Sequence, residues 1–232
     1  MKGGKVLELL RTEYLTKSYG FKETEVKALK PTDFSINEGE FTAIIGPSGS
    51  GKSTLLHLLA GLDKPSSGKV YINGKEIYSM SEKELSKFRR TNIGFIFQFF
   101  NLIPILSIEE NIKLPILMDG RKVDEDYFNE IMETLGLTDR KRHLSGEVSG
   151  GQQQRASIAR ALITKPSIIF ADEPTGNLDS KNSEEVMDLL TMSIKKYNQT
   201  LVMITHDPKI AERADRIITI SDGEISGDRR TH

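Results

Sequence analysis

One glycine-rich stretch has the composition and spacing of a phosphate-binding loop. Residues 46–53 match the pattern G-x-x-x-x-G-K-[ST] without a gap. Glycines let a backbone wrap closely around phosphates, and the N–H groups at a helix N-terminus attract negative charge. In this pattern Lys52 reaches the β- and γ-phosphates, and the Ser53 hydroxyl ligates Mg²⁺. The candidate binding residues are Gly46, Pro47, Ser48, Gly49, Ser50, Gly51, Lys52, Ser53 and Thr54.

An acidic pair follows an apolar segment further along the chain. Residues 168–171 are expected to form a buried strand that ends at Asp172 and Glu173. In open α/β sheets, ligands bind at such strand ends. Asp172 is therefore a candidate Mg²⁺ ligand through the water shell, and Glu173 is a candidate general base for an attacking water. Taken alone, the pair also fits a solvated strand-to-turn junction. The phosphate loop makes the catalytic interpretation preferable.

A third motif lies just before a predicted helix over residues 153–164. Ser149, Gly150, Gly151 and Gln152 would present a hydroxyl and two glycine N–H groups to an anion at the N-terminus of that helix. A flexible loop with an N-cap serine is the alternative. The nearby residues 144–147 begin in a similar way, but Glu147 replaces the second glycine, and we reject them as the motif.

The elements that must position these motifs alternate between strand and helix. A short apolar strand over residues 41–45 precedes the phosphate loop, and a helix begins near Lys52. This alternation predicts an α/β fold with a mostly parallel sheet, preceded by an antiparallel β region and interrupted by a helical insertion. The expected division is a core that carries the phosphate loop, over 1–98 and 149–227, a helical subdomain over 99–148 and a flexible tail over 228–232.

Composition limits the function classes that remain. The formal net charge of −1 over 232 residues excludes a basic nucleic-acid footprint at the level of the whole chain. The absence of cysteine excludes disulfides and thiolate metal sites. Apolar runs are far shorter than the roughly 20 residues of a membrane-spanning helix. We therefore expect a soluble protein, and the pore of any transport system would lie on another polypeptide.

These motifs together resemble the ABC ATPases. Residues 148–152 are similar to the LSGGQ signature of that family, with Val148 in place of the usual leucine. The resemblance covers about Leu7 to Gly223 and implies that the bound nucleotide is ATP with Mg²⁺. It also implies further site residues. Gln98 would sense and ligate Mg²⁺, Asp179 would belong to the D-loop, His206 would contact the γ-phosphate and Tyr19 would stack on adenine.

Two of these assignments compete with simpler interpretations. Tyr19 could be an ordinary strand tyrosine, because aromatic residues are common in strands. A lone histidine is more often structural than catalytic, although His206 follows a predicted strand over residues 201–205.

The resemblance further implies a head-to-tail homodimer that encloses two ATP molecules. The phosphate loop of each subunit would face Ser149 of the other. The dimer would bind a separate transmembrane permease from the cytoplasmic side, as a peripheral protein on the inner face of the cell membrane. Residues 99–106 are unusually apolar. They would either close the core of the helical subdomain or form a groove for a cytoplasmic helix of the permease.

Within the family, the chain resembles the short ATPases of lipoprotein release, macrolide-type efflux and antimicrobial-peptide resistance. The likeness is carried by residues 95–98, 101–104, 150–155 and 172–181. ABC ATPases of DNA repair are a poorer fit, because no long heptad pattern is present. Translation-associated ABC proteins normally have two ATPase halves, and this chain has one phosphate loop. A regulatory ATPase that drives a membrane partner without moving a substrate remains open.

Overall fold

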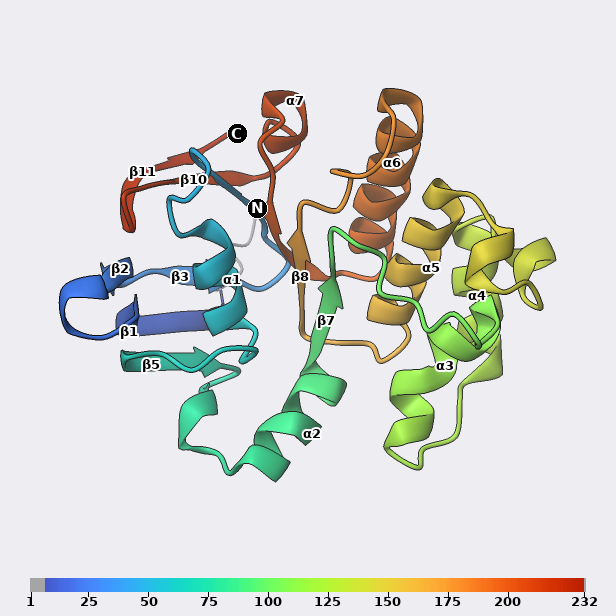
Figure 1. Cartoon of the computed structure of the whole chain (residues 1–232). Coiled ribbons are helices and arrows are strands. Elements are labelled where there is room, and N and C mark those ends of the chain that lie inside the picture. Colours follow the sequence, from blue (N-terminus) through green and yellow to red (C-terminus); the bar gives the residue numbers. More distant parts are fainter. Residues whose placement is uncertain (1–6, 232) are drawn as a thin grey trace, which may run out of the picture. The chain divides into compact units, whose positions relative to one another are not determined.

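The computed structural model describes residues 7–231, which divide into two compact units. The first unit comprises residues 1–86 and 200–232, and the second comprises residues 87–199. Helix α2 (Glu82–Asn92) spans the boundary. Figure 1 labels most of the helices and strands, and each unit is described by itself.

The first unit contains an antiparallel β region. Its long strand β1 (Glu8–Tyr19) pairs antiparallel with three strands, and one of these partners, β5, pairs with a short strand, β6. The three partners of β1 are β2 (Val26–Thr32), β3 (Ser35–Asn37) and β5 (Ser67–Ile72), and β6 covers Lys75–Glu76. Short 3-10 turns, η1 (Lys22–Thr24) and η2 (Ile77–Ser79), complete the region.

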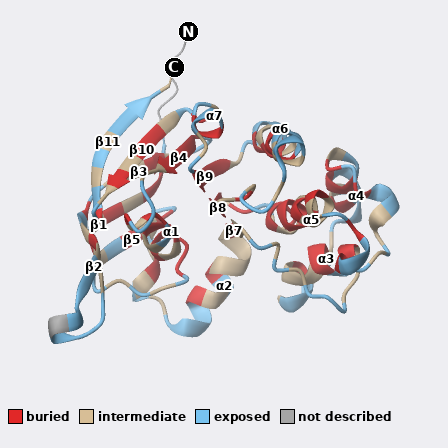
Figure 2. Cartoon of the chain, turned by 45° about the horizontal axis from the view of Figure 1, so that its top comes forward, coloured by how far each residue is buried: buried red, intermediate tan, exposed pale blue. Residues whose placement is uncertain are grey.

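The same unit contains parallel strands that lead to the phosphate loop. Strand β4 (Phe41–Ile45) is parallel to both β9 (Thr200–Ile204) and β10 (Arg216–Ser221). Helix α1 (Lys52–Leu59) follows β4, and the short α7 (Pro208–Ala211) follows β9. All five residues of β9 are buried, as Figure 2 shows in red. Because both faces of the strand are covered, its sequence does not alternate between apolar and polar residues.

The second unit packs helices around two parallel strands. Strands β7 (Ile93–Ile96) and β8 (Ile168–Asp172) are parallel, and Gly94 lets α5 approach closely, because a Cβ there would lie 2.8 Å from the Ala161 carbonyl oxygen. The helices are α3 (Ile108–Met118), α4 (Glu125–Thr134), α5 (Gly150–Leu162) and α6 (Ser180–Lys196), with 3-10 turns η3 (Thr138–Arg140) and η4 (Ser145–Glu147). In the described range 7–231, no helix is long and apolar enough to cross a membrane.

The predicted α/β fold with an N-terminal antiparallel region is confirmed, but the expected flexible tail is wrong for residues 228–230. These residues continue strand β11 (Glu224–Arg230), which pairs antiparallel with β10. The Asp228 carboxylate accepts hydrogen bonds from Arg216 at 2.8 and 2.6 Å. Most residues of β11 are exposed and polar, so the sequence lacks the apolar pattern that predicts a buried strand. His232 lies outside the described residues.

Candidate functional site

The phosphate loop connects β4 to α1 through backbone conformations that suit glycine. Gly46, Gly49 and Gly51 have φ angles of 146°, 76° and 104°. A Cβ on Gly46 would lie 2.0 Å from the Ile220 carbonyl oxygen, and one on Gly51 would lie 2.3 Å from the Ala28 carbonyl oxygen. Both glycines are therefore required by packing within the first unit. Around Gly49 there is open space, so this glycine instead leaves the loop accessible.

Polar groups in the loop are arranged to receive an anion. Gly51, the N-cap residue of α1, has no side chain that could accept a hydrogen bond from the first turn of the helix. The Ser50 hydroxyl is buried and has no hydrogen-bond partner among the described residues. Lys52 is also buried, and its Nζ donates to the Gly46 and Pro47 carbonyl oxygens at 2.9 and 2.7 Å. Unfilled donors beside a buried ammonium group fit a bound phosphate chain.

His206 reaches the same edge of the sheet as the loop. The strands β4 and β9 are parallel and in register from Phe41 with Leu201 to Ile44 with Ile204. The Thr205 N–H donates to the Ile44 carbonyl oxygen at 3.2 Å. Since both strands end at this point, the loop and the exposed His206 follow neighbouring strand ends.

Tyr19 lies at the end of β1 with 44% of its surface exposed. Its hydroxyl donates to the Asp63 carboxylate at 2.8 Å, and it also hydrogen-bonds Thr54 in the first turn of α1. The tyrosine that the resemblance assigns to adenine is therefore attached to the helix that carries the phosphate loop.

In the second unit, the acidic pair ends β8. Asp172 is the last residue of the strand, and Glu173 follows with a φ of 44°. This left-handed conformation is unfavourable for a non-glycine residue and is found preferentially at functional sites. The Gly176 N–H donates to the Glu173 carbonyl oxygen at 2.9 Å, which closes a turn immediately after the pair.

Gln98 lies beside this turn. Ile96 on β7 is in register with Ala171 on β8, so Gln98 and Glu173 both follow the ends of adjacent parallel strands. A Cβ on Gly176 would lie 3.0 Å from the Gln98 Nε2 atom, and Asn177 Nδ2 donates to the Gln98 carbonyl oxygen at 2.9 Å. The structure therefore places Gln98 beside the turn that follows Glu173.

Ser149 caps the helix that it precedes. Its hydroxyl accepts from the Gln152 N–H at 3.3 Å, while the Gln152 side chain accepts from the Ser149 N–H at 2.9 Å. Gly150 and Gly151 lie in the first turn of the helix, where a backbone N–H has no preceding helical carbonyl as its acceptor. The helix begins at Gly150, three residues before the predicted start.

Asp179 stands directly beside this helix start. Its carboxylate caps α6 by accepting from the Asn182 N–H at 2.9 Å, and this backbone hydrogen bond lowers the pKa of Asp179 below its ordinary value. The Asn182 Oδ1 atom would lie 2.9 Å from a Cβ on Gly151, and Leu178 packs near Gly150. The residues that the resemblance assigns to the D-loop and to the signature motif are thus neighbours within the second unit.

Sequence reasoning missed two residues of α5 that hold backbone next to the candidate site residues: Gln154 bonds the turn after Glu173, and Arg160 bonds the segment after Gln98. Gln154 is fully buried, and its Nε2 atom donates to the Pro174 carbonyl oxygen at 2.6 Å. The Arg160 guanidinium donates to the carbonyl oxygens of Phe100 and Asn101 at 3.0 and 2.6 Å. Polar residues among the alanines, Ile158 and Leu162 of α5 were a signal that these positions have buried partners.

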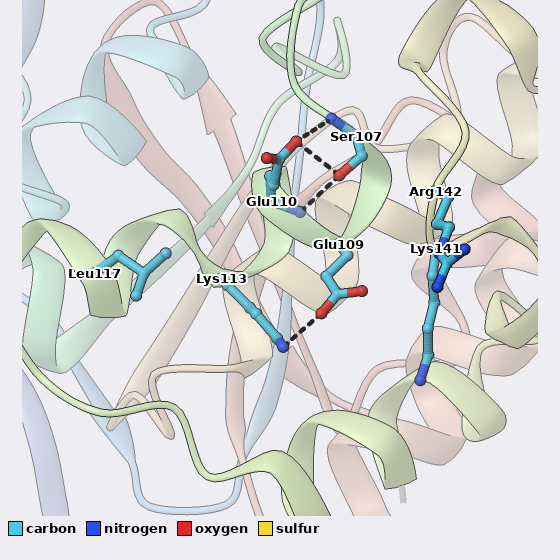
Figure 3. A pocket seen from close by; sticks show the side chains of 7 residues that line it. All are labelled: Ser107, Glu109, Glu110, Lys113, Leu117, Lys141 and Arg142. Carbon is cyan, nitrogen blue, oxygen red and sulfur yellow. Dashed lines mark hydrogen bonds and ion pairs between the residues drawn. The ribbon is translucent and has the colours of Figure 1, made fainter.

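A separate cleft lies in the second unit, away from these motifs. Its volume is about 440 Å³, and Figure 3 shows its seven lining residues, among them Glu109, Glu110 and Lys113. Glu110 completes the cap of α3 with Ser107, and Lys113 Nζ donates to Glu109 at 2.6 Å. Lys141 Nζ donates to Asn129 Oδ1 at 2.6 Å, and none of the predicted site residues lines this cleft. In the described range 7–231, no cluster of three His, Cys, Asp or Glu residues is arranged to hold a metal ion.

Comparison with known proteins decides the family. The ABC transporter family model matches residues 29–176, which is more than half of the chain. The chain belongs to the ABC transporter family. The predicted resemblance to this family is therefore confirmed.

Two relatives and one solved structure illustrate this ABC protein's likeness. It is 46% identical over 216 residues to the macrolide export ATP-binding/permease protein MacB of Bdellovibrio bacteriovorus, covering 93% of the chain but 33% of MacB. It is 46% identical over 220 residues to the lipoprotein-releasing system ATP-binding protein LolD of Cytophaga hutchinsonii, and this match covers 94% of the chain and 99% of LolD. The dimeric post-hydrolysis structure of the ATP-binding cassette MJ0796, bound to ADP and Pi, matches the present structure with a TM-score of 0.87 at 41% sequence identity. The match covers 97% of the chain and 99% of the MJ0796 chain. The chain thus spans a third of the length of its MacB relative.

Proposed function

We propose that this ABC protein binds and hydrolyses ATP and that it drives a membrane permease. The observation that carries the proposal is the phosphate loop. It combines an uncapped helix N-terminus, an unpaired Ser50 hydroxyl and the buried Lys52 ammonium group in one short segment. Bound ATP with Mg²⁺ would supply the phosphoanhydride bond that is cleaved. The residues of the chain position that bond, neutralise its charge and activate water.

Each candidate residue receives a role from its chemistry. Lys52 would exchange its two loop carbonyl partners for phosphate oxygens, and Ser53, Asp172 and Gln98 are the residues that we propose as Mg²⁺ ligands. Glu173 accepts a proton from the attacking water. His206 would contact the terminal phosphate from the neighbouring strand end. The expected division into a core over 1–98 and 149–227 and a helical subdomain over 99–148 belongs to this proposal.

Replacing Lys52 with alanine tests the nucleotide site. Hydrogen bonds to charged groups contribute about 1.5–3 kcal/mol, so we expect the affinity for Mg-ADP to fall roughly 10- to 100-fold. Isothermal titration calorimetry measures this change, and phosphate release should fall with it. Lys69→Ala is the matched control, because Lys69 is an exposed lysine of the same unit on β5. Equal affinity in the Lys52→Ala and Lys69→Ala proteins would refute the proposed site.

The proposed working unit is a homodimer with ATP at its interface. Support comes from the dimeric MJ0796 cassette and from the anion-ready start of α5. In this arrangement Ser149, Gly150 and Gly151 of one subunit face the terminal phosphate that the other subunit holds. Asp179 lies next to them at the cap of α6. The terminal phosphate completes the interface, so its loss on hydrolysis lets the dimer open.

We further propose that the permease docks on the apolar segment after Gln98. Phe99, Ile103 and Ile105 are 68%, 38% and 84% exposed, so they do not close a core. Arg160 fixes the backbone between Phe99 and Ile103 by hydrogen bonds to the carbonyl oxygens of Phe100 and Asn101. An exposed apolar segment with a fixed backbone fits docking of a permease helix better than closure of the core of the helical subdomain.

A Phe99→Glu, Ile105→Glu double variant is expected to abolish association with the permease. Both side chains are exposed, so the melting temperature and ATP affinity of the isolated subunit should stay near the wild-type values. Co-purification with the permease measures the effect. Phe100 is a poorer probe, because its ring packs near Gly150 at the start of α5. Met192→Glu, at an exposed apolar position of α6, is the control. Undiminished association of the double variant would remove these residues from the docking surface.

The relatives point to a class of transported molecule. The named relatives act in macrolide export and lipoprotein release, so we propose that the system exports or extracts a hydrophobic or peptide-like substrate. LolD, of which the chain covers 99%, is named as an ATP-binding protein, which supports a permease on a separate subunit. We propose that the chain binds that permease peripherally, on the cytoplasmic face of the membrane. An ATPase that drives a regulatory membrane complex is the second candidate. The identity of the co-purifying membrane protein distinguishes the two.

A further inference from the structure

Two residues outside the predicted nucleotide-binding motifs hold the Tyr19 side chain: Lys17 contacts one face of its ring, and Asp63 binds its hydroxyl. Lys17 lies two residues earlier on β1, and its Nζ atom is 4.8 Å from the centre of the Tyr19 ring. The same Nζ atom donates to the Asp63 carboxylate at 2.8 Å and to the Lys64 carbonyl oxygen at 2.6 Å. Two hydrogen bonds and one ring face account for the three donors of the ammonium group.

Asp63 fixes the other end of this arrangement. One carboxylate oxygen accepts from Lys17 and the Lys64 N–H, and the other accepts from the Tyr19 hydroxyl at 2.8 Å. The Asp63 carbonyl oxygen accepts from the Tyr78 hydroxyl at 2.7 Å, which ties the residue to η2. Since Asp63 follows α1 closely, it joins the end of β1 to the helix that carries the phosphate loop.

The charges agree with this geometry. Partial burial raises the pKa of the Asp63 carboxyl, but hydrogen bonds from Lys17, Tyr19 and the Lys64 N–H outweigh it, so its pKa lies below the ordinary value. Burial and the Asp63 carboxylate raise the pKa of the Tyr19 phenol. At neutral pH a neutral phenol therefore donates to an ionised carboxylate. The lysine side chain is only 12% exposed, so its ion pair is less screened than a surface pair.

We propose that Lys17 and Asp63 are positioning residues that present the free face of the Tyr19 ring to the base of the nucleotide. Lys17 lies over one face of the ring, and 44% of the Tyr19 surface remains exposed, so a base would stack on the opposite face. A ring that is already fixed loses little freedom when a base stacks on it. The inference rests on the proposed function, in which Tyr19 stacks on adenine.

The test compares ligands with and without a base. Mg-ADP and Mg-pyrophosphate share the diphosphate that the loop binds, but only ADP can use the ring. In Lys17→Met we expect Mg-ADP affinity to fall about 3- to 10-fold, as for loss of a cation–π anchor and its ion pair. Mg-pyrophosphate affinity should stay unchanged. Asp63→Asn should behave in the same way, and Lys69→Met controls for the lost charge.

Tyr19→Ala separates this inference from the function on which it depends. Stacking contributes about 1–3 kcal/mol per base, so Tyr19→Ala should weaken Mg-ADP roughly 5- to 150-fold, and adding Lys17→Met should weaken it no further. If Tyr19→Ala alone has no effect, the stacking role itself is wrong. If Tyr19→Ala weakens ADP but Lys17→Met does not, the positioning role is wrong. Equal losses for ADP and pyrophosphate in Lys17→Met would indicate a purely structural role and would also overturn it.

Discussion

The Glu173→Gln variant is expected to bind ATP normally and to hydrolyse it about 10²–10⁴-fold more slowly than the wild type. The amide keeps the size of the side chain but removes the carboxylate that accepts a proton from water. Gln and Glu meet the same backbone strain at a φ of 44°, so the substitution leaves the turn after β8 unchanged. Affinity for ATP and the melting temperature should therefore remain near those of the wild type.

Phosphate release under saturating ATP measures the rate, and size-exclusion chromatography with and without ATP measures assembly. The slow variant should accumulate as an ATP-bound dimer, because the contact that hydrolysis removes persists. Glu184→Gln, at an exposed position of α6, is the matched control. A Glu173→Gln protein that hydrolyses ATP at the wild-type rate would exclude Glu173 as the general base.

Mixing two inactive variants is expected to restore ATP hydrolysis. Lys52→Ala damages the phosphate loop, and Ser149→Arg places a bulky cation at the start of α5. If Ser149 acts on the nucleotide of the partner, a mixed dimer has one site with both defects and one site with neither. The activity of the intact site should then appear only on mixing. Phosphate release is measured with one variant in excess over the other.

Two controls make this result interpretable. Ser149 caps its own helix, and loss of a cap costs about 1 kcal/mol, so Ser149→Ala reports the effect of the cap alone. Both sites of a dimer could be required to act together, in which case mixing fails although Ser149 acts on the partner. Photocrosslinking from position 149 in such mixtures resolves this case. Labelling of nucleotide held by the same chain, without labelling of the partner's nucleotide, would contradict action across the interface.

The sequence alone determined the motifs and the elements that carry them. The phosphate loop, the strand that ends at Asp172 and the helix after Ser149 are local features. Their signals lie within windows of about ten residues, as do apolar strand patterns, glycine conformations and helix caps. The α/β fold class and the ABC family followed from these motifs and are confirmed. The roles of the individual site residues stay predictions.

Only the tertiary structure decided which distant residues hold the motifs in place. Lys17 meets Asp63 across 46 residues, Gln154 meets Pro174 across 20, and Arg160 meets Phe100 across 60. Strand β11 was not predicted, because its polar sequence is stabilised by pairing with β10 and not by burial. A charged or amide side chain looks the same in sequence whether it is solvated or satisfies a buried carbonyl. Its partner is selected by the packing of elements that are far apart in the chain.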